Sequence, residues 1–194
     1  MERKFLAIIF IPLAVVLVAT GITFYIKGND RALKGSVIDP PIIAPGITLN
    51  GPDGRDVRLS EFRGKFVLIF FGYTHCPDEC PATLAILRQV RTDLGTEASS
   101  IQVLFVTTDP ARDTPERLAS YLSTFDNTFI GLTSSASDLA NVYRDYGVTV
   151  LDNGETHSTL IFVVDRDGKL GLTFPIGMTP ADMEHDLRIV MGVR

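Results

Sequence analysis

The chain has 194 residues, of which 45% are hydrophobic and 21% charged, and its formal net charge is −5 at pH 7. This length suits one globular domain plus an apolar segment, and the positive mean hydropathy of +0.21 agrees with such a segment. Residues 35–194 contain 13 Lys and Arg against 21 Asp and Glu. A domain this acidic is a poor candidate for binding nucleic acid or anionic lipid surfaces.

The N-terminal segment 5–26 contains no charged side chain. At 1.5 Å per residue a helix of this length crosses a hydrocarbon core of about 30 Å, and membrane helices tolerate residues such as Pro12 and Gly21. We therefore expect residues 1–4 to be cytoplasmic and 5–26 to form a transmembrane anchor. A cleaved signal peptide is the alternative. Basic residues lie on both sides of the segment, so charge alone does not set its orientation.

Residues 27–45 are polar and then rich in proline, which is typical of an extended tether. We predict that they form a linker and that residues 46–194 form the folded domain. Just after the linker, two short strand-like runs at 47–49 and 56–59 flank Asn50-Gly51-Pro52-Asp53-Gly54, which predicts a hairpin.

Strands and helices then alternate along the chain. Apolar runs predict buried strands at 65–72, 101–107 and 159–164, and a turn at Asp167-Gly168 leads into a further strand at 169–174. Helical periodicity after residue 80 ends at Gly95. Three further helices begin at cap signals: one at Thr114 running to Phe125, one at Ser135 running to about Tyr146, and one at Thr179.

This order predicts an α/β domain in which a central sheet carries helices on both faces. It is the thioredoxin-like pattern with an extra helical insertion. About 150 residues are enough to bury a core without disulfides.

Cys76 and Cys80 are the only cysteines, and they follow the strand predicted at 65–72. A strand-to-helix turn exposes such groups, and the positive end of the helix favours thiolate over thiol. A spacing of four residues places both sulfurs on one side of a helical turn. The pair is suited to closing a disulfide or to binding a soft metal ion, for which a third ligand would be needed.

Three histidines are candidates for that ligand. His185 lies in the last predicted helix and is typical of an ordinary surface residue. His75 precedes Cys76, but adjacent residues in an extended turn point in opposite directions. His157 comes just before the strand at 159–164. In a thioredoxin-like sheet that loop lies beside the cysteine loop, so His157 is the preferred third ligand.

Three segments resemble motifs of the Sco (SenC) family, the membrane-anchored copper proteins of cytochrome c oxidase assembly. They are 71–81 (Phe-Gly-Tyr-Thr-His-Cys-Pro-Asp-Glu-Cys-Pro), 107–115 (Thr-Thr-Asp-Pro-Ala-Arg-Asp-Thr-Pro) and His157-Ser158. The resemblance implies that Cys76, Cys80 and His157 bind one copper ion and that Asp109 lies near the site. Asp109 also has a purely structural interpretation, as a cap on the turn into the helix at Thr114.

The resemblance further implies a single-pass protein of the bacterial inner membrane whose domain faces the periplasm. The implied recipient is the dinuclear copper centre of cytochrome c oxidase subunit II, and an upstream copper chaperone is a further partner to consider. Cys₂His suits Cu(I), and its imidazole also suits Cu(II), although zinc accepts the same ligands with a fourth.

Two enzymatic alternatives share the position of the cysteines after a strand. The first is a thiol-disulfide oxidoreductase acting on a partner's cysteines, which Cys76 and Cys80 could serve as a redox pair. Against it, three residues rather than two separate the cysteines, and Ser158 stands where thioredoxins carry a cis-proline. The second is a thioredoxin-like peroxidase, for which Arg112 is the only evident candidate for the arginine that it needs. Copper delivery and thiol reduction are compatible in one protein.

Overall fold

The computed structural model describes residues 32–151, 156–157 and 160–193, and of residues 151, 156 and 157 it describes only the backbone. Residues 34–194 form one compact unit. In the described part of the chain, no helix is both long enough and apolar enough to cross a membrane. The anchor predicted at 5–26 lies outside the described residues.

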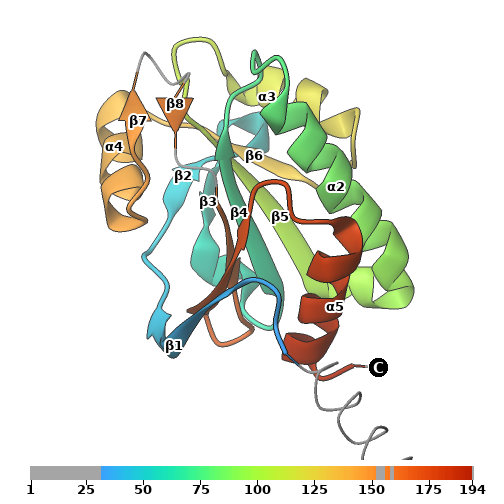
Figure 1. The fold of residues 1–194 in the computed structure, drawn as a ribbon. Coiled ribbons are helices and arrows are strands. Elements are labelled where there is room, and N and C mark those ends of the chain that lie inside the picture. Colours follow the sequence, from blue (N-terminus) through green and yellow to red (C-terminus); the bar gives the residue numbers. More distant parts are fainter. Residues whose placement is uncertain (1–31, 152–155, 158–159, 194) are drawn as a thin grey trace, which may run out of the picture. The chain divides into compact units, whose positions relative to one another are not determined.

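A mixed sheet of six strands forms the centre of this unit (Figure 1). The strand order is β1-β10-β9-β4-β5-β6, and the parallel strands β4, β5 and β6 occupy one side of the sheet. The remaining neighbours pair antiparallel. The strands are β1 (Ser36–Ile43), β4 (Phe66–Gly72), β5 (Ile101–Thr107), β6 (Ile130–Leu132), β9 (Leu160–Val164) and β10 (Lys169–Pro175).

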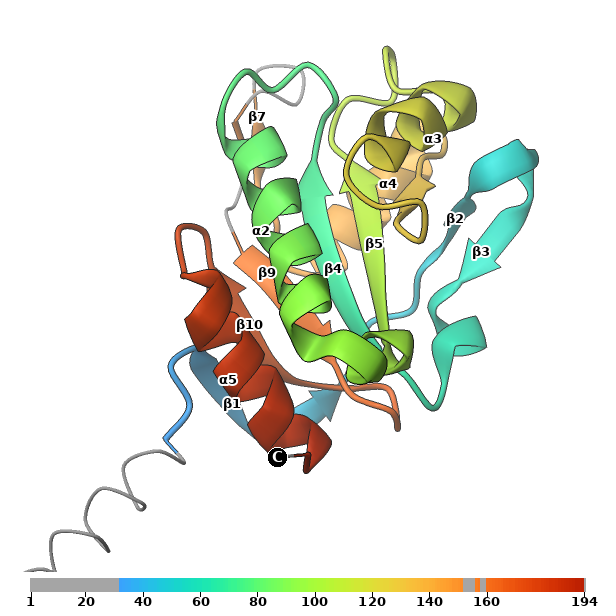
Figure 2. The same ribbon diagram turned by 90° about the vertical axis from the view of Figure 1, so that its right-hand side faces the viewer.

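Helices cover both faces of this sheet, as predicted: Figure 2 shows α2 and α5 in front of it and α4 behind. The side chains of Thr114, Ser135 and Thr179 cap α3, α4 and α5 as expected. The helices are α2 (Glu79–Leu94), α3 (Pro115–Ser123), α4 (Ala136–Asp145) and α5 (Pro180–Met191). This is the thioredoxin-like α/β fold that the order of elements predicts.

Short elements complete the unit. The predicted hairpin is present as the two-stranded sheet of β2 (Thr48–Asn50) and β3 (Asp56–Arg58), with the 3-10 turn η1 (Pro52–Gly54) between the strands. Two other 3-10 turns are η2 (Leu59–Phe62) and η3 (Gly95–Ser100). A second small sheet pairs β7 (Val150–Leu151) with β8 (Thr156–His157).

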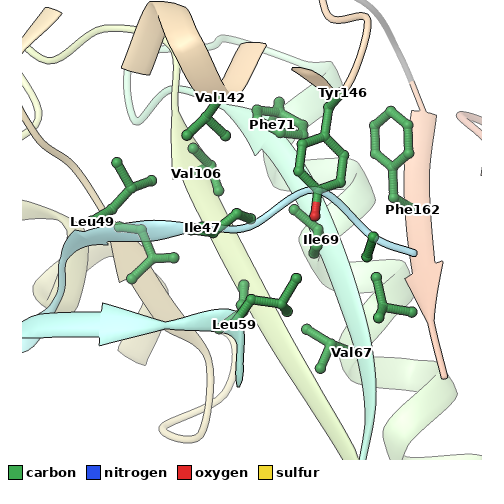
Figure 3. Packing of buried hydrophobic residues seen from close by; sticks show 14 of the residues in the cluster. Ile47, Leu49, Leu59, Val67, Ile69, Phe71, Val106, Val142, Tyr146 and Phe162 are labelled. Carbon is green, nitrogen blue, oxygen red and sulfur yellow. The ribbon is translucent and has the colours of Figure 1, made fainter. Parts of the chain in front are cut away.

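One apolar cluster of the core lies on the α4 face of the sheet (Figure 3). All seven residues of β4 are buried, because this strand has a neighbour on each side and helices on both faces. Phe71 makes edge contacts with the ring of Phe162, and Tyr146 packs against both rings. The ring contacts hold α4 against the middle of the sheet.

The predicted linker needs correction for residues 36–43, which form the edge strand β1. Ser36 and Val37 pair with β10 at one end of the strand, Ile42 and Ile43 pair with it at the other, and the register shifts between these two stretches. Pro40 and Pro41 lie inside the shift. Proline lacks the N–H that a ladder requires, and such an irregularity in an edge strand is where it is tolerated.

Candidate metal centre

The two cysteines lie where β4 passes into α2. Cys76 is half-buried in the connecting loop, and Cys80 is fully buried in the first turn of the helix. Both are free thiols, and the backbone N–H of Cys80 donates to Cys76 Sγ at 3.3 Å. The two sulfurs lie within hydrogen-bonding reach of each other, although Cys76 precedes the helix and does not share a helical turn with Cys80.

The two thiols have opposite acidity. Burial opposes ionisation of Cys76, but hydrogen bonds from the backbone N–H groups of Cys80 and Asp78 and from the Cys80 thiol lower its pKa below the usual value. Burial raises the pKa of Cys80 far above that of an ordinary thiol, and negative charge at Cys76 and Glu79 raises it further. Cys76 is therefore the sulfur prepared to be a thiolate, and Cys80 is the sulfur that shares its proton with Cys76.

Gly72, the last residue of β4, allows Cys80 to approach the sheet closely. A Cβ at this position would lie 2.8 Å from Cys80 Sγ and 2.9 Å from the ring of Phe105. Any larger residue would displace the buried sulfur or the ring. The glycine is needed for space.

A buried carboxylate holds the start of the cysteine loop. Asp113 is fully buried, and it accepts hydrogen bonds from the Thr74 backbone N–H (3.1 Å), the Thr74 hydroxyl (2.5 Å) and the Thr107 hydroxyl (2.6 Å). Thr107 ends β5, and Thr74 lies two residues before Cys76. Asp113 therefore fixes the loop that carries Cys76 to the end of the neighbouring strand.

His75 takes part in the same network. The guanidinium of Arg117 lies 2.8 Å from His75 Nε2 and donates to the Thr74 hydroxyl at 2.9 Å. A guanidinium can only donate, so His75 Nε2 accepts this bond and its lone pair is engaged. His75 is thus poorly placed to serve as the third ligand.

Asp109 is grouped with His75, the residue before Cys76, and its part in the site stays a prediction. It is 3% exposed, its carbonyl oxygen accepts from the N–H of Arg112 and of Asp113, and its carboxylate pairs with the Arg112 guanidinium. Among the described residues, one group of potential metal ligands has its donor atoms within 4.8 Å of one another: His75, Asp109 and Asp113. Hydrogen-bond donors already occupy atoms of all three, which makes the group a structural hub. The pairing of Arg112 with Asp109 also weakens the peroxidase alternative.

The backbone of His157 lies at the cysteine end of the sheet. β9 runs antiparallel to β4, with Ile161 opposite Phe70, so the chain entering β9 lies beside the end of β4. Figure 1 shows β8, which includes His157, at this end of the sheet. The His157 side chain is outside what the structure describes, and its role as the third ligand stays a prediction.

Three residues around the site were not identified from the sequence. Asp113 and Thr74 lie within motifs that were recognised, but they are 39 residues apart and nothing local indicates that they bond. Tyr121 lies on α3, where burial raises its pKa and negative charge at Cys80, Cys76 and Asp113 raises it further. Its position shows no signal in the sequence beyond helical periodicity.

Comparison with known proteins places this geometry in a family. Residues 39–192 match the family model described as SCO1/SenC. The chain belongs to the SCO1/SenC family. The motifs at 71–81 and 107–115 and His157 all lie within the matched range, so the resemblance predicted from them is confirmed.

Relatives in this family include the protein SCO2 homolog of mitochondria in Bos taurus. It is 40% identical over 127 residues, which cover 64% of this chain and 47% of that protein. The chain thus matches about half the length of this Sco relative.

Two solved Sco structures share the fold. ScoI of Bradyrhizobium japonicum, solved with copper bound, is 34% identical, with a TM-score of 0.68 over 77% of this chain and 98% of that one. Apo Sco1 of Thermus thermophilus is 32% identical, with a TM-score of 0.72 over 84% of this chain and 98% of that one.

Proposed function

We propose that this protein binds one copper ion through Cys76, Cys80 and His157 and serves the assembly of cytochrome c oxidase. The observation that carries the proposal is the thiol pair: two hydrogen-bonded sulfurs, one with a lowered pKa, just after the end of a buried strand. Soft thiolates favour Cu(I), and a ligand with nitrogen extends the set to Cu(II). Copper bound in the Sco structure from Bradyrhizobium japonicum supports the same cargo here.

Delivery of copper to the dinuclear centre of oxidase subunit II is the first form of this function. Reduction of a disulfide in the recipient to two thiols is the second form, and the unequal acidity of Cys76 and Cys80 supports it. The Cys76 thiolate attacks a partner disulfide, which forms a mixed disulfide and releases one partner thiolate. Cys80, once it has lost its proton, attacks the Cys76 sulfur; this releases the second partner thiolate and leaves a Cys76–Cys80 disulfide. The two forms differ in what leaves the protein: a copper ion in delivery, two electrons in reduction.

The proposal includes a membrane anchor at 5–26 that holds the domain on the periplasmic side of the bacterial inner membrane. The uncharged stretch of 22 residues supports it. A mature N-terminus that starts beyond about residue 20 would instead identify a cleaved signal peptide.

Copper stoichiometry of the purified protein tests the site. Wild-type protein should bind one Cu(I) per chain, and Cys80→Ser should lose tight binding because a hydroxyl is a hard and poorly ionised donor. His157→Ala should weaken Cu(II) more than Cu(I), since two thiolates can hold Cu(I) alone. His185→Ala is the matched control and should bind both ions as wild type does. Unchanged stoichiometry in Cys80→Ser would rule out the assignment.

Prior oxidation separates a site on these sulfurs from one elsewhere. A Cys76–Cys80 disulfide consumes both ligands, so oxidised protein should take up almost no Cu(I) until a reductant is added. Copper-loaded protein should in turn resist alkylation of its thiols. Equal Cu(I) uptake by the oxidised and reduced forms would move the metal to other residues.

A further inference from the structure

The hydroxyl of Tyr121 is a buried polar group that lacks a hydrogen-bond partner. Among the buried side-chain nitrogen and oxygen atoms of the described residues, it is the only one without a hydrogen-bond partner. A buried hydroxyl without a partner is destabilising and calls for a specific explanation. Phenylalanine would supply the same ring without that cost.

Two tyrosines of α4 and its C-terminal cap show how a buried phenol hydroxyl is usually satisfied. The hydroxyl of Tyr143 donates to the carbonyl of Thr107 at 2.6 Å, and that of Tyr146 donates to the carbonyl of Pro45 at 2.9 Å. Both therefore fasten a helix to another element by a backbone acceptor. The hydroxyl of Tyr121, by contrast, makes no hydrogen bond that would hold α3 to another element.

The Tyr121 ring lies next to the thiol pair, with the ring of Phe105 linking the two. The Tyr121 ring packs against Phe105, with centroids 6.3 Å apart, and against Phe125, with centroids 5.4 Å apart. The Phe105 ring in turn borders Cys80 Sγ, because both lie within 3 Å of the position that a Cβ at Gly72 would occupy. Tyr121, Phe105 and Cys80 therefore lie on one face of the sheet, at the end where Figure 2 shows the start of α2.

Electrostatics agree with this placement. Burial raises the pKa of Tyr121, and negative charge at Cys80 and at Cys76 raises it further, with Cys80 the stronger of the two. The phenol thus keeps its proton at physiological pH and remains a donor. Its natural acceptor is a nearby group that gains negative charge.

We propose that Tyr121 donates its hydroxyl proton in a hydrogen bond to the Cys80 sulfur when that sulfur is a copper-bound thiolate. This inference rests on the proposed function, in which Cys80 is a ligand. A neutral thiol is a weak acceptor, whereas a thiolate accepts strongly. The metal-free protein therefore holds the donor unused, and copper binding supplies its acceptor.

Such a bond would act on the metal through the ligand. Cys80 is fully buried, so no water competes for the charge of its sulfur once copper has replaced the thiol proton, which is released to solvent. Hydrogen bonds to a metal-bound cysteine sulfur adjust both affinity and electronic structure. Tyr121 is therefore a positioning residue for the copper thiolate and not itself a ligand.

The test compares Tyr121→Phe with Tyr146→Phe in the full-length protein. Three quantities are measured: Cu(I) affinity by competition with a chelator, the sulfur-to-Cu(II) charge-transfer band, and the thermal stability of metal-free protein. Tyr121→Phe should bind Cu(I) about tenfold more weakly, a difference of about 1.4 kcal/mol. Its charge-transfer band should move to longer wavelength, because an unbonded sulfur gives up an electron more easily. Its metal-free stability should be unchanged or higher.

Tyr146→Phe should show the reverse pattern. It loses the bond to the Pro45 carbonyl, so it should be less stable without metal while binding copper as wild type does. If wild-type protein bound copper and Tyr121→Phe matched it in affinity and band position, the inference would be overturned and the proposed function would stand. If wild-type protein bound no copper, the proposed function would fail first.

Discussion

The apolar core beneath α4 and the polar end of β5 keep their shapes by different means. In this core cluster, Val67, Ile69 and Phe71 of β4 are buried together with Leu139 and Val142 of α4, and the dispersion attraction that holds such a cluster has no required direction. At the end of β5, Thr107, Asp109 and Asp113 are equally buried but are held by hydrogen bonds of fixed geometry.

The difference assigns separate tasks to the two regions. Packed apolar groups adjust by small shifts, so the apolar cluster beneath α4 contributes to the stability of the unit without fixing the position of any one side chain at the thiols. A hydrogen-bond hub has discrete partners, so the polar end sets the position of the loop that carries Cys76. Damage to the first region should appear as lost stability alone, and damage to the second should appear in copper binding as well.

The largest expected effect on stability comes from the core. Leu139 is fully buried in α4, and Leu139→Ala should lower the free energy of unfolding by about 3 kcal/mol through lost contacts and a cavity. Chemical denaturation of the metal-free protein measures this. Folded Leu139→Ala should bind Cu(I) as wild type does, and a large loss of affinity would contradict the separation of tasks.

Asp113→Asn tests the polar end with almost no change of volume. The amide keeps one acceptor oxygen, but its NH₂ group then faces a donor that the carboxylate had accepted. The free energy of unfolding should fall by about 2 kcal/mol. Copper affinity should fall too, because the loop after Thr74 loses its attachment. Wild-type copper affinity in this variant would show that the loop holds its position without Asp113.

The sequence predicts well what depends on neighbours along the chain. Periodicity locates β4, β5 and α2, and the side chains of Thr114, Ser135 and Thr179 cap their helices as expected. The thiol pair can also be predicted from the sequence, because its four-residue spacing and its position after a buried strand are local features.

What the sequence does not reveal depends on distant partners. β1 pairs with β10 more than 120 residues away, and the prolines of β1 make this segment resemble an extended linker in the sequence. The Thr74–Asp113 bonds join two motifs whose contact only the fold creates. The unsatisfied hydroxyl of Tyr121 is defined by its surroundings, which no periodicity encodes.

The two thiols, Cys76 and Cys80, should react at different rates with an alkylating reagent. The pKa of Cys76 is lowered and that of Cys80 is raised, so at neutral pH reduced metal-free protein should be labelled at Cys76 at least about tenfold faster. The rate at Cys76 should rise with pH and level off at a lower pH than for an ordinary thiol. Peptide mapping after brief labelling identifies the site, and equal labelling would contradict the assigned acidities.

The same shifts predict how stability depends on pH. Because the pKa of Cys76 is lower in the folded chain than in the unfolded one, its ionisation stabilises the fold above the unfolded pKa, and this contribution is lost as the pH falls through the folded pKa. The raised pKa of Cys80 acts oppositely and should destabilise the metal-free fold at alkaline pH. Replacing each cysteine by Ser separates the two slopes.

The smallest predicted effect concerns Thr114, the residue that caps the N-terminus of α3. Thr114 Oγ1 accepts from the N–H of Arg117 at 3.2 Å, and α3 carries both Arg117 and Tyr121 to the thiol end of the sheet. Thr114→Ala should cost about 1 kcal/mol of stability, and the matched change Thr179→Ala, which uncaps α5 in the same way, should cost a similar amount. Of these two variants, only Thr114→Ala should weaken Cu(I) binding, because α3, and not α5, brings side chains to Thr74, His75 and the thiols. If both variants bound copper equally well, α3 would serve packing alone, and the polar end would depend on Asp113 without help from the helix.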